Sequence, residues 1–166
     1  MSYSKDDLLF APLGGSGEIG MNVNLYHFRD SWIMVDLGIS FPDESTPGVD
    51  IILPDLKFIA DRREKLAGLV LTHGHEDHFG AIPYLWSQIG CPIYGTPFTI
   101  ALLRRKLSES RVALDIPLHE IGMNAPFNLG SFEIEMVALN HSIPDPAALA
   151  IEIEIAVDVR RQSRRR

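Results

Sequence analysis

The chain has 166 residues, of which 46% are hydrophobic and 22% charged, as in one ordinary globular domain. These values exclude an intrinsically disordered, collagen-like or coiled-coil protein. Its one cysteine, Cys91, excludes an internal disulfide and a cysteine-based metal site, so metal ligands must be histidines and carboxylates. No apolar run reaches the roughly 18–20 residues of a transmembrane helix, and the acidic N-terminus does not resemble a signal peptide. Together these features favour a cytoplasmic protein with no membrane association.

The formal net charge of −7 is distributed unevenly along the chain. Five of the 15 basic residues are arginines at positions 160, 161, 164, 165 and 166, and the rest of the chain therefore has a formal charge of −12. Such a body does not attract a nucleic acid by long-range electrostatics. A nucleic acid would have to be held by a metal site or by parts outside this chain.

Hydrophobic patterning predicts alternating strands and helices. Strands are expected at 8–13 (buried), 23–27, 32–35, 69–71, 92–95, 112–121, 132–139 and 147–159. Helices are expected at 56–66, with Gly68 as its stop, at 81–89 and at 98–107; a loop is expected at 41–54 and a turn at 124–130. This order predicts a layered α/β domain with a mixed sheet.

A glycine-rich segment follows the first predicted strand. Residues 15–20 read GSGEIG, which matches the dinucleotide-binding pattern G-x-G-x-x-G, and Asp36 follows at about the distance of a ribose-binding acid. A dinucleotide site needs a helix to begin at this loop, whereas residues 21–26 alternate like a strand. The favoured interpretation is a tight turn between two strands, in which glycine supplies positive φ, and no dinucleotide-binding residues are predicted.

Three histidines and an aspartate fall within six residues: His73, His75, Asp77 and His78. The cluster lies where a predicted buried strand ends and a helix begins, a place where side chains converge. Residues 73 and 75 point to the same side of an extended backbone, and Asp77 and His78 lie beyond the bend. A lone histidine is usually structural, but this set of zinc-ligand types predicts a metal site, and two pairs indicate two adjacent ions.

The other histidines differ in their surroundings. His141 follows the predicted strand at 132–139 and begins a polar turn, so it is the natural third ligand for the ion at His73 and His75. His27 and His119 lack a partner pattern and are interpreted as structural or surface residues. Glu76, inside the cluster, is interpreted as a solvated side chain.

With these motifs the sequence resembles the metallo-β-lactamase superfamily, whose hallmark is H-x-H-x-D-H. Within it, the similarity is closer to the ribonuclease J family of the β-CASP group. The matching segments, within residues 8–150, are PLGGSGEIGMN (12–22), MVDLG (34–38), GVDIILPD (48–55), LTHGHEDHFGAIPYL (71–85), PIYGTP (92–97) and HSIPD (141–145). The H-x-H-x-D-H motif identifies the superfamily, and the glycine loop and the ILPD segment point to ribonuclease J.

The resemblance implies an αββα sandwich, present here as its N-terminal portion, with two zinc ions at one edge. His73, His75 and His141 would bind one ion, and Asp77 and His78, with catalytic roles, would bind the other. Asp36 would not bind an ion itself but would orient the loop that carries His73 to His78. The implied reaction is hydrolysis of RNA phosphodiesters, internally or from the 5′ end, and homo-oligomerisation would use regions beyond this chain.

The resemblance ends near residue 150. The family continues with a Thr-Gly-Asp segment whose aspartate bridges the metals, and with a later histidine, and neither is present here. We therefore expect residues 1–150 to be the N-terminal part of the domain and 151–166 to be an atypical arginine-rich tail, from truncation or a frameshift. Three hypotheses stay open: a ribonuclease impaired as this isolated chain, a non-catalytic metal-binding fragment, and a small-molecule hydrolase of the same fold.

Overall fold

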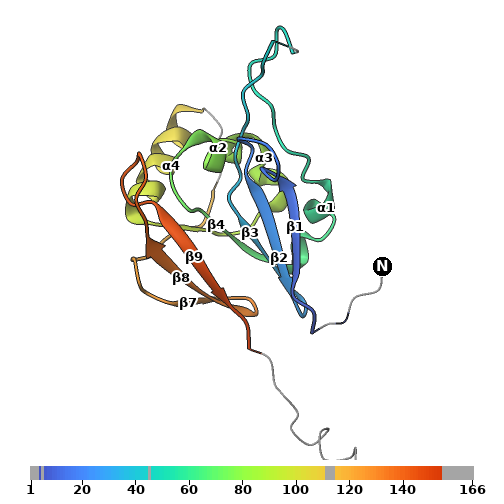
Figure 1. Ribbon diagram of the computed structural model, residues 1–166, viewed down its shortest axis with the longest axis vertical. Helices are drawn as coiled ribbons and strands as arrows, with labels where there is room; N and C mark the ends of the chain where they lie inside the picture. Colours follow the sequence, from blue (N-terminus) through green and yellow to red (C-terminus); the bar gives the residue numbers. More distant parts are fainter. Residues whose placement is uncertain (1–3, 5, 45, 111–114, 155–166) are drawn as a thin grey trace, which may run out of the picture.

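Two β-sheets make up the centre of the structure, a computed structural model that describes residues 4, 6–44, 46–110 and 115–154 (Figure 1). The larger sheet has the strand order β1 (Leu9–Gly14), β2 (Val23–Phe28), β3 (Ser31–Val35), β4 (Leu66–Val70), β5 (Ile93–Gly95) and β6 (Leu118–Glu120). The smaller sheet comprises β7 (Phe127–Leu129), β8 (Phe132–Ala138) and β9 (Ala147–Glu152), in orange and red in Figure 1. The helices are α1 (Lys57–Ala60), α2 (Glu76–Phe79), α3 (Ile82–Ile89) and α4 (Pro97–Glu109), with a 3₁₀ turn at Arg63–Lys65.

The larger sheet changes direction along its width. β1, β2 and β3 pair antiparallel, whereas β3, β4, β5 and β6 pair parallel. The carboxyl ends of parallel strands meet at one edge of the sheet, where α/β proteins bind ligands. The segments that follow β3 and β4 therefore come together, and they begin with Asp36 and with Leu71-Thr72-His73.

Apolar side chains form two cores, one on each face of the larger sheet. On one face, side chains of the sheet pack with those of all four helices, including Leu25, Met34 and Ile82. On the other face, Phe28, Ile33 and Val70 pack against Phe132, Ile134 and Met136 of the smaller sheet. The described residues thus form a helical layer and two sheet layers, which agrees with the expected N-terminal portion of an αββα sandwich.

The helix predicted at 56–66 is wrong over most of its length. It ends at Ala60, and Leu66 and Gly68 belong to β4. Apolar residues of the short helix and of the next strand happen to fall at helical spacing. Gly68 is not a helix stop: a Cβ there would lie 2.8 Å from Cε2 of Tyr94, so the glycine makes room for this ring against the strand.

Two strand predictions and one turn prediction need correction. The first strand is half exposed rather than buried, and Phe10 is 54% exposed, because β1 forms the edge of the larger sheet. The turn predicted at 124–130 contains β7, which pairs with β8. Of the strand predicted at 112–121, only Leu118–Glu120 is a strand, and residues 111–114 lie outside the described residues.

The C-terminal predictions extend past the described part of the chain. β9 ends at Glu152, and residues 155–159 of the predicted strand, like the arginine-rich segment, lie outside the described residues. The division of the chain after residue 150 therefore stays a prediction. Among the described residues, no helix is both long and apolar enough to cross a bilayer.

Candidate metal centre

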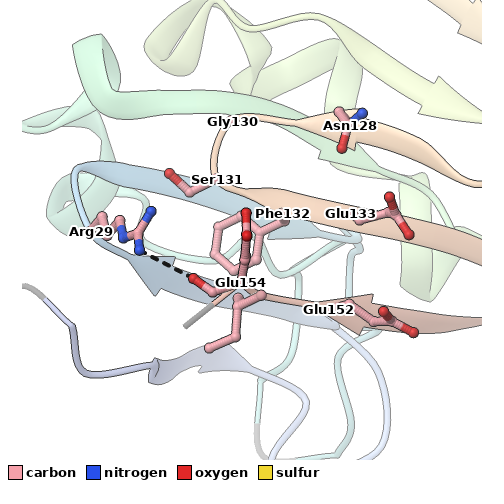
Figure 2. A pocket seen from close by; sticks show the side chains of 9 residues that line it. Arg29, Asn128, Gly130, Ser131, Phe132, Glu133, Glu152 and Glu154 are labelled. Atoms are coloured by element: carbon pink, nitrogen blue, oxygen red, sulfur yellow. Dashed lines mark hydrogen bonds between the residues drawn. The ribbon is translucent and has the colours of Figure 1, made fainter. Parts of the chain in front are cut away.

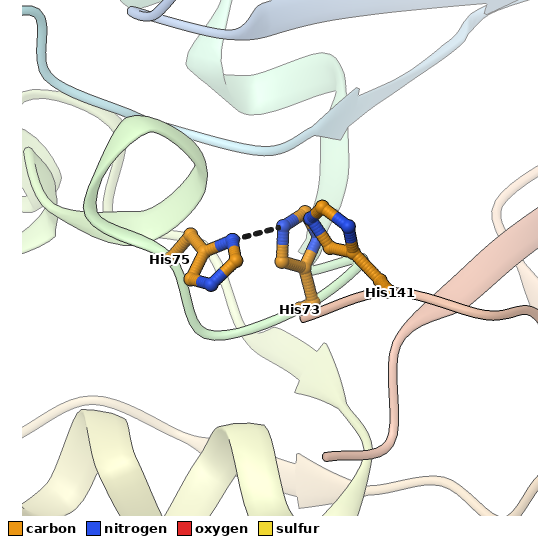
Figure 3. Close-up of side chains that lie close together, drawn as sticks. All are labelled: His73, His75 and His141. Atoms are coloured by element: carbon orange, nitrogen blue, oxygen red, sulfur yellow. Dashed lines mark hydrogen bonds between the residues drawn. The ribbon is translucent and has the colours of Figure 1, made fainter. Parts of the chain in front are cut away.

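Three histidine side chains converge beyond the carboxyl end of β4 (Figure 3). One ligand atom from each of His73, His75 and His141 can be chosen so that all lie within 4.8 Å of one another. The ring centroids of His73 and His75 are 4.8 Å apart, and His141 lies 4.8 Å from the first ring and 4.9 Å from the second. His73 is buried, His75 half-buried and His141 exposed, so the cluster opens to solvent on one side.

His141 reaches the cluster from the smaller sheet. It lies on the loop between β8 and β9, about 65 residues beyond the other two histidines in sequence. Two hydrogen bonds hold this loop: the amide of Ala147 donates to the carbonyl of Thr72 at 2.9 Å, and the Thr96 hydroxyl donates to the carbonyl of Asp145 at 3.4 Å. The predicted neighbour of His73 and His75 is therefore in place.

Asp36 connects β3 to residues 72–78, which follow β4, carry four of the predicted ligands and are called the ligand loop. Its carboxylate is buried, and Oδ1 accepts a hydrogen bond of 2.8 Å from the amide of Thr72. Oδ2 lies 2.7 Å from Nδ1 of His78. A proton on Nδ1 of His78 satisfies this contact and leaves the lone pair of the ring on Nε2, which is the tautomer that binds a metal through this atom. The predicted role of Asp36 behind the ligands is supported by these contacts.

Thr72 is a further residue of the candidate site that the sequence analysis missed. Its hydroxyl lies 2.8 Å from Oδ2 of Asp36 and 3.0 Å from Nδ1 of His73. The hydroxyl can donate to the carboxylate and accept from Nδ1–H of His73, which leaves Nε2 of His73 as the ligand atom. Its place directly before the first histidine was the available signal, but threonine is common in strands.

The electrostatic environment keeps His73 uncharged. Burial, followed by the charges of His78, His75 and His141, lowers the pKa of His73 to about 4. A neutral imidazole has a lone pair for a cation, so His73 is ready to bind metal at neutral pH. For His78, burial lowers the pKa, but the hydrogen bond that the ring donates to Asp36 and the charges of Asp36 and Asp77 outweigh it and raise the pKa overall.

Asp77 and His78 form a second pair of potential ligands. Oδ2 of Asp77 lies 3.5 Å from Nε2 of His78, and the ring of His78 lies 4.0 Å from that of His73. Asn22, which follows the glycine-rich segment, also contacts this pair, and the sequence analysis missed it. The structure therefore brings all five predicted ligands together in two adjacent groups.

The remaining candidate residues lie outside these groups. Glu76, expected to be solvated, pairs through both carboxylate oxygens with Nζ of Lys106 on α4, at 2.9 and 2.8 Å. His27 is buried with its ring centroid 4.6 Å from that of Trp32, and exposed His119 stacks on Tyr94 at 4.7 Å. Both agree with a structural or surface role.

A cavity of about 600 Å³ lies away from the histidines, at the end of β9 and the start of β8 (Figure 2). Arg29 borders it and donates a hydrogen bond of 3.2 Å to the carbonyl of Glu154. Glu133 and Glu152 also line the cavity, and none of the predicted ligands does. It is therefore separate from the candidate metal centre.

Comparison with known proteins assigns the fold. Residues 18–149 match the Metallo-beta-lactamase superfamily. The chain belongs to this superfamily. Among solved structures, a protein of unknown function from Enterococcus faecalis has a TM-score of 0.65 at 20% identity, covering 89% of this chain and 41% of that protein. The metallo-beta-lactamase fold protein YhfI from Bacillus subtilis has a TM-score of 0.59 at 19% identity, covering 86% and 57%. These similarities confirm the predicted fold.

Relatives found by sequence similarity carry the name Ribonuclease J. Ribonuclease J from Sinorhizobium meliloti is 42% identical over 158 residues, covering 93% of this chain and 28% of the relative. Ribonuclease J from Helicobacter pylori is 41% identical over 150 residues, covering 90% and 22%, and that from Thermus thermophilus is 38% identical over 162 residues, covering 93% and 28%. The chain spans about a quarter of the length of these relatives, and the predicted resemblance is confirmed.

The donor set fits a metal of intermediate softness. Imidazole nitrogens suit first-row transition metals, and the three converging rings include one that is neutral. The superfamily fold and the histidine cluster together therefore indicate metal binding.

Proposed function

We propose that this chain is the metal-binding part of a zinc-dependent ribonuclease of the ribonuclease J type. The observation that carries the proposal is the cluster of His73, His75 and His141 beside Asp77 and His78. It occurs in a chain that is 38–42% identical to proteins named Ribonuclease J. Three imidazoles around one position are a ligand set used by catalytic zinc.

Each ligand has a role in this proposal. His73, His75 and His141 hold one zinc ion, and Asp77 and His78 hold a second. Asp36 keeps the proton of His78 on Nδ1, and Thr72 does the same for His73, so each ring directs Nε2 to the metal side. Both positioning contacts exist without a metal, which reduces the reorganisation needed on binding.

The proposed substrate is a phosphodiester of RNA. Zinc at such a site supplies a Lewis acid that lowers the pKa of water and stabilises negative charge on phosphate oxygens. The chain supplies few other attractions for a polyanion, because its formal net charge is −7. We therefore place RNA at the exposed side of the cluster, next to His141, and propose a cytoplasmic location for this reaction.

Metal titration tests the first part of the proposal. We expect the metal-free chain to bind zinc in calorimetry, and His141→Ala to weaken binding by more than about 100-fold, since loss of a ligand exceeds the 10–100-fold typical of outer contacts. His119→Ala is the matched control, because His119 is exposed and stacks on Tyr94 outside the cluster. Zinc binding by His141→Ala that equals the unmodified chain would refute the ligand assignment.

Substrate comparison tests the second part. We expect the zinc-loaded chain to cleave RNA weakly, because it spans 22–28% of the length of its Ribonuclease J relatives, and a chelator should abolish the cleavage. Thioester and lactam substrates should not be hydrolysed faster than RNA. Faster hydrolysis of either would identify a small-molecule hydrolase, and zinc binding without any cleavage would identify a non-catalytic fragment.

A further inference from the structure

The glycine-rich segment, residues 15–20, lies between β1 and β2. It is followed by Asn22, which contacts Asp77 of the ligand loop. The predicted turn between two strands is confirmed, with positive φ at Gly15, Gly17 and Gly20. A Cβ at Gly15 would lie 2.5 Å from Oδ1 of Asn22, so the turn packs directly against this side chain. The turn and its close contact with Asn22 fix the position of this side chain.

The main chain of Asn22 joins two segments of the metal centre. Its amide donates to the carbonyl of Asp77 at 2.9 Å, and its carbonyl accepts from the amide of Gly38 at 3.1 Å. Asn22 thus lies between the segment that follows β3 and the ligand loop that follows β4. Neither bond needs the side chain, because any residue could make both.

The side chain of Asn22 makes contacts that require a hydrogen-bond donor. Nδ2 lies 3.0 Å from the carbonyl oxygen of Asp77, 3.4 Å from Oδ2 of the same residue and 3.2 Å from Nε2 of His78. All three partners are acceptors when Nδ1 of His78 donates to Asp36. The two protons of an NH₂ group can be shared among these acceptors, whereas a carboxylate at position 22 would face acceptors with an acceptor.

We propose that Asn22 is the positioning residue of the Asp77/His78 pair, and that the glycine-rich turn serves to hold its amide there. Asp36 binds His78 on the Nδ1 side and Asn22 binds it on the Nε2 side, so the ring is held from both. The same amide keeps Oδ2 of Asp77 near Nε2 of His78. The inference rests on the proposed function, in which the second zinc ion would take the lone pair of Nε2 in place of the amide, while the hydrogen bond from Nδ2 to the carbonyl of Asp77 would remain.

Imidazole nitrogen spectra of the metal-free chain test the contact directly. In Asn22→Ala, the ¹⁵N resonance of Nε2 of His78 should shift, whereas that of Nδ1 should stay because Asp36 still binds it. Asn24→Ala, which replaces a half-buried asparagine of β2 two residues further along the chain, is the matched control and should move neither resonance. A loss that is only structural would move both resonances or lower the melting temperature. An unmoved Nε2 resonance in folded Asn22→Ala would overturn the proposal.

Cobalt titration of the same variants tests the consequence. We expect the unmodified chain to bind two ions, and Asn22→Ala to bind the second about 10–100-fold more weakly with the first unchanged. Equal affinity for the second ion in both proteins would overturn the proposal. Binding of one ion by the unmodified chain would instead contradict the two-metal part of the proposed function, and the nitrogen spectra alone would then decide the role of Asn22.

Discussion

Replacing Gly38 by alanine should distort the ligand loop more than any other single methyl group at a described glycine. The ideal Cβ would lie 1.7 Å from the carbonyl oxygen of Asp77, 2.1 Å from its carbonyl carbon and 2.7 Å from the amide nitrogen of His78. All three atoms belong to the main chain, so no side-chain rotation can relieve the overlap. Residues 37–39 and the ligand loop must move apart.

The magnitude follows from what this movement breaks. Overpacking in a rigid site costs about 1–3 kcal/mol. The amides of Leu37 and Ile39 donate to the carbonyls of His78 and Glu76 at 2.7 and 3.1 Å, and losing each bond costs about 1 kcal/mol. The total is about 3–5 kcal/mol, and with a urea m-value of about 2 kcal/mol/M the unfolding midpoint should fall by about 1.5–2.5 M.

Urea unfolding of the metal-free chain, followed by tryptophan fluorescence, measures this loss. Gly122→Ala is the matched control, because its nearest neighbour is Cβ of Ala125 at 3.9 Å, and its midpoint should change by less than about 0.5 M. Zinc affinity of Gly38→Ala should fall as well, since Asp77 and His78 are displaced. Equal midpoints for the two variants would refute the close approach of the two segments.

Three further outcomes are expected. Asp36→Asn keeps a residue that tolerates the φ of 62° at this position but loses the charge of the carboxylate, so unfolding should become easier by about 1.5–3 kcal/mol; an unchanged urea midpoint would contradict the contacts assigned to Asp36. Gly74→Ala should cost less than Gly38→Ala, because the new methyl group meets Cδ1 of Leu102 at 2.6 Å, the end of a side chain that can rotate; a larger loss in urea unfolding would show that Leu102 is fixed. Cys91 is buried, and burial raises the pKa of its thiol to about 12, so a disulfide reagent should label it at neutral pH only upon unfolding; fast labelling of the folded chain would contradict the packing of the first core.

Local patterns were sufficient to predict which side chains gather at the candidate metal centre. Four of the five expected ligands lie within six residues, and the end of a buried strand fixes their direction. His141 was predicted from its place after a strand, and the structure brings it to within 4.9 Å, between ring centroids, of both His73 and His75. The assignment of these residues as ligands stays a prediction that the titrations above can test.

Two supporting residues, Asn22 and Thr72, were not predicted, because their roles depend on contacts across long sequence separations. Asn22 meets Asp77 across 55 residues, and Thr72 meets Asp36 across 36. The secondary-structure prediction was wrong at β4 for a related reason. Gly68 is suited to ending a helix by its type, but Tyr94 on the neighbouring strand requires a residue without a side chain there. Only the paired strands reveal that requirement.

The three-histidine cluster draws its members from both sheets, since His73 and His75 follow β4 and His141 precedes β9. An ion bound by all three would therefore act as a cross-link between the two layers of the sandwich. Through mass action, an ion present at 100 times its dissociation constant adds about 2.7 kcal/mol to folding stability. Availability of the metal would then govern how firmly the second layer stays docked, as well as the chemistry at the edge of the sheets.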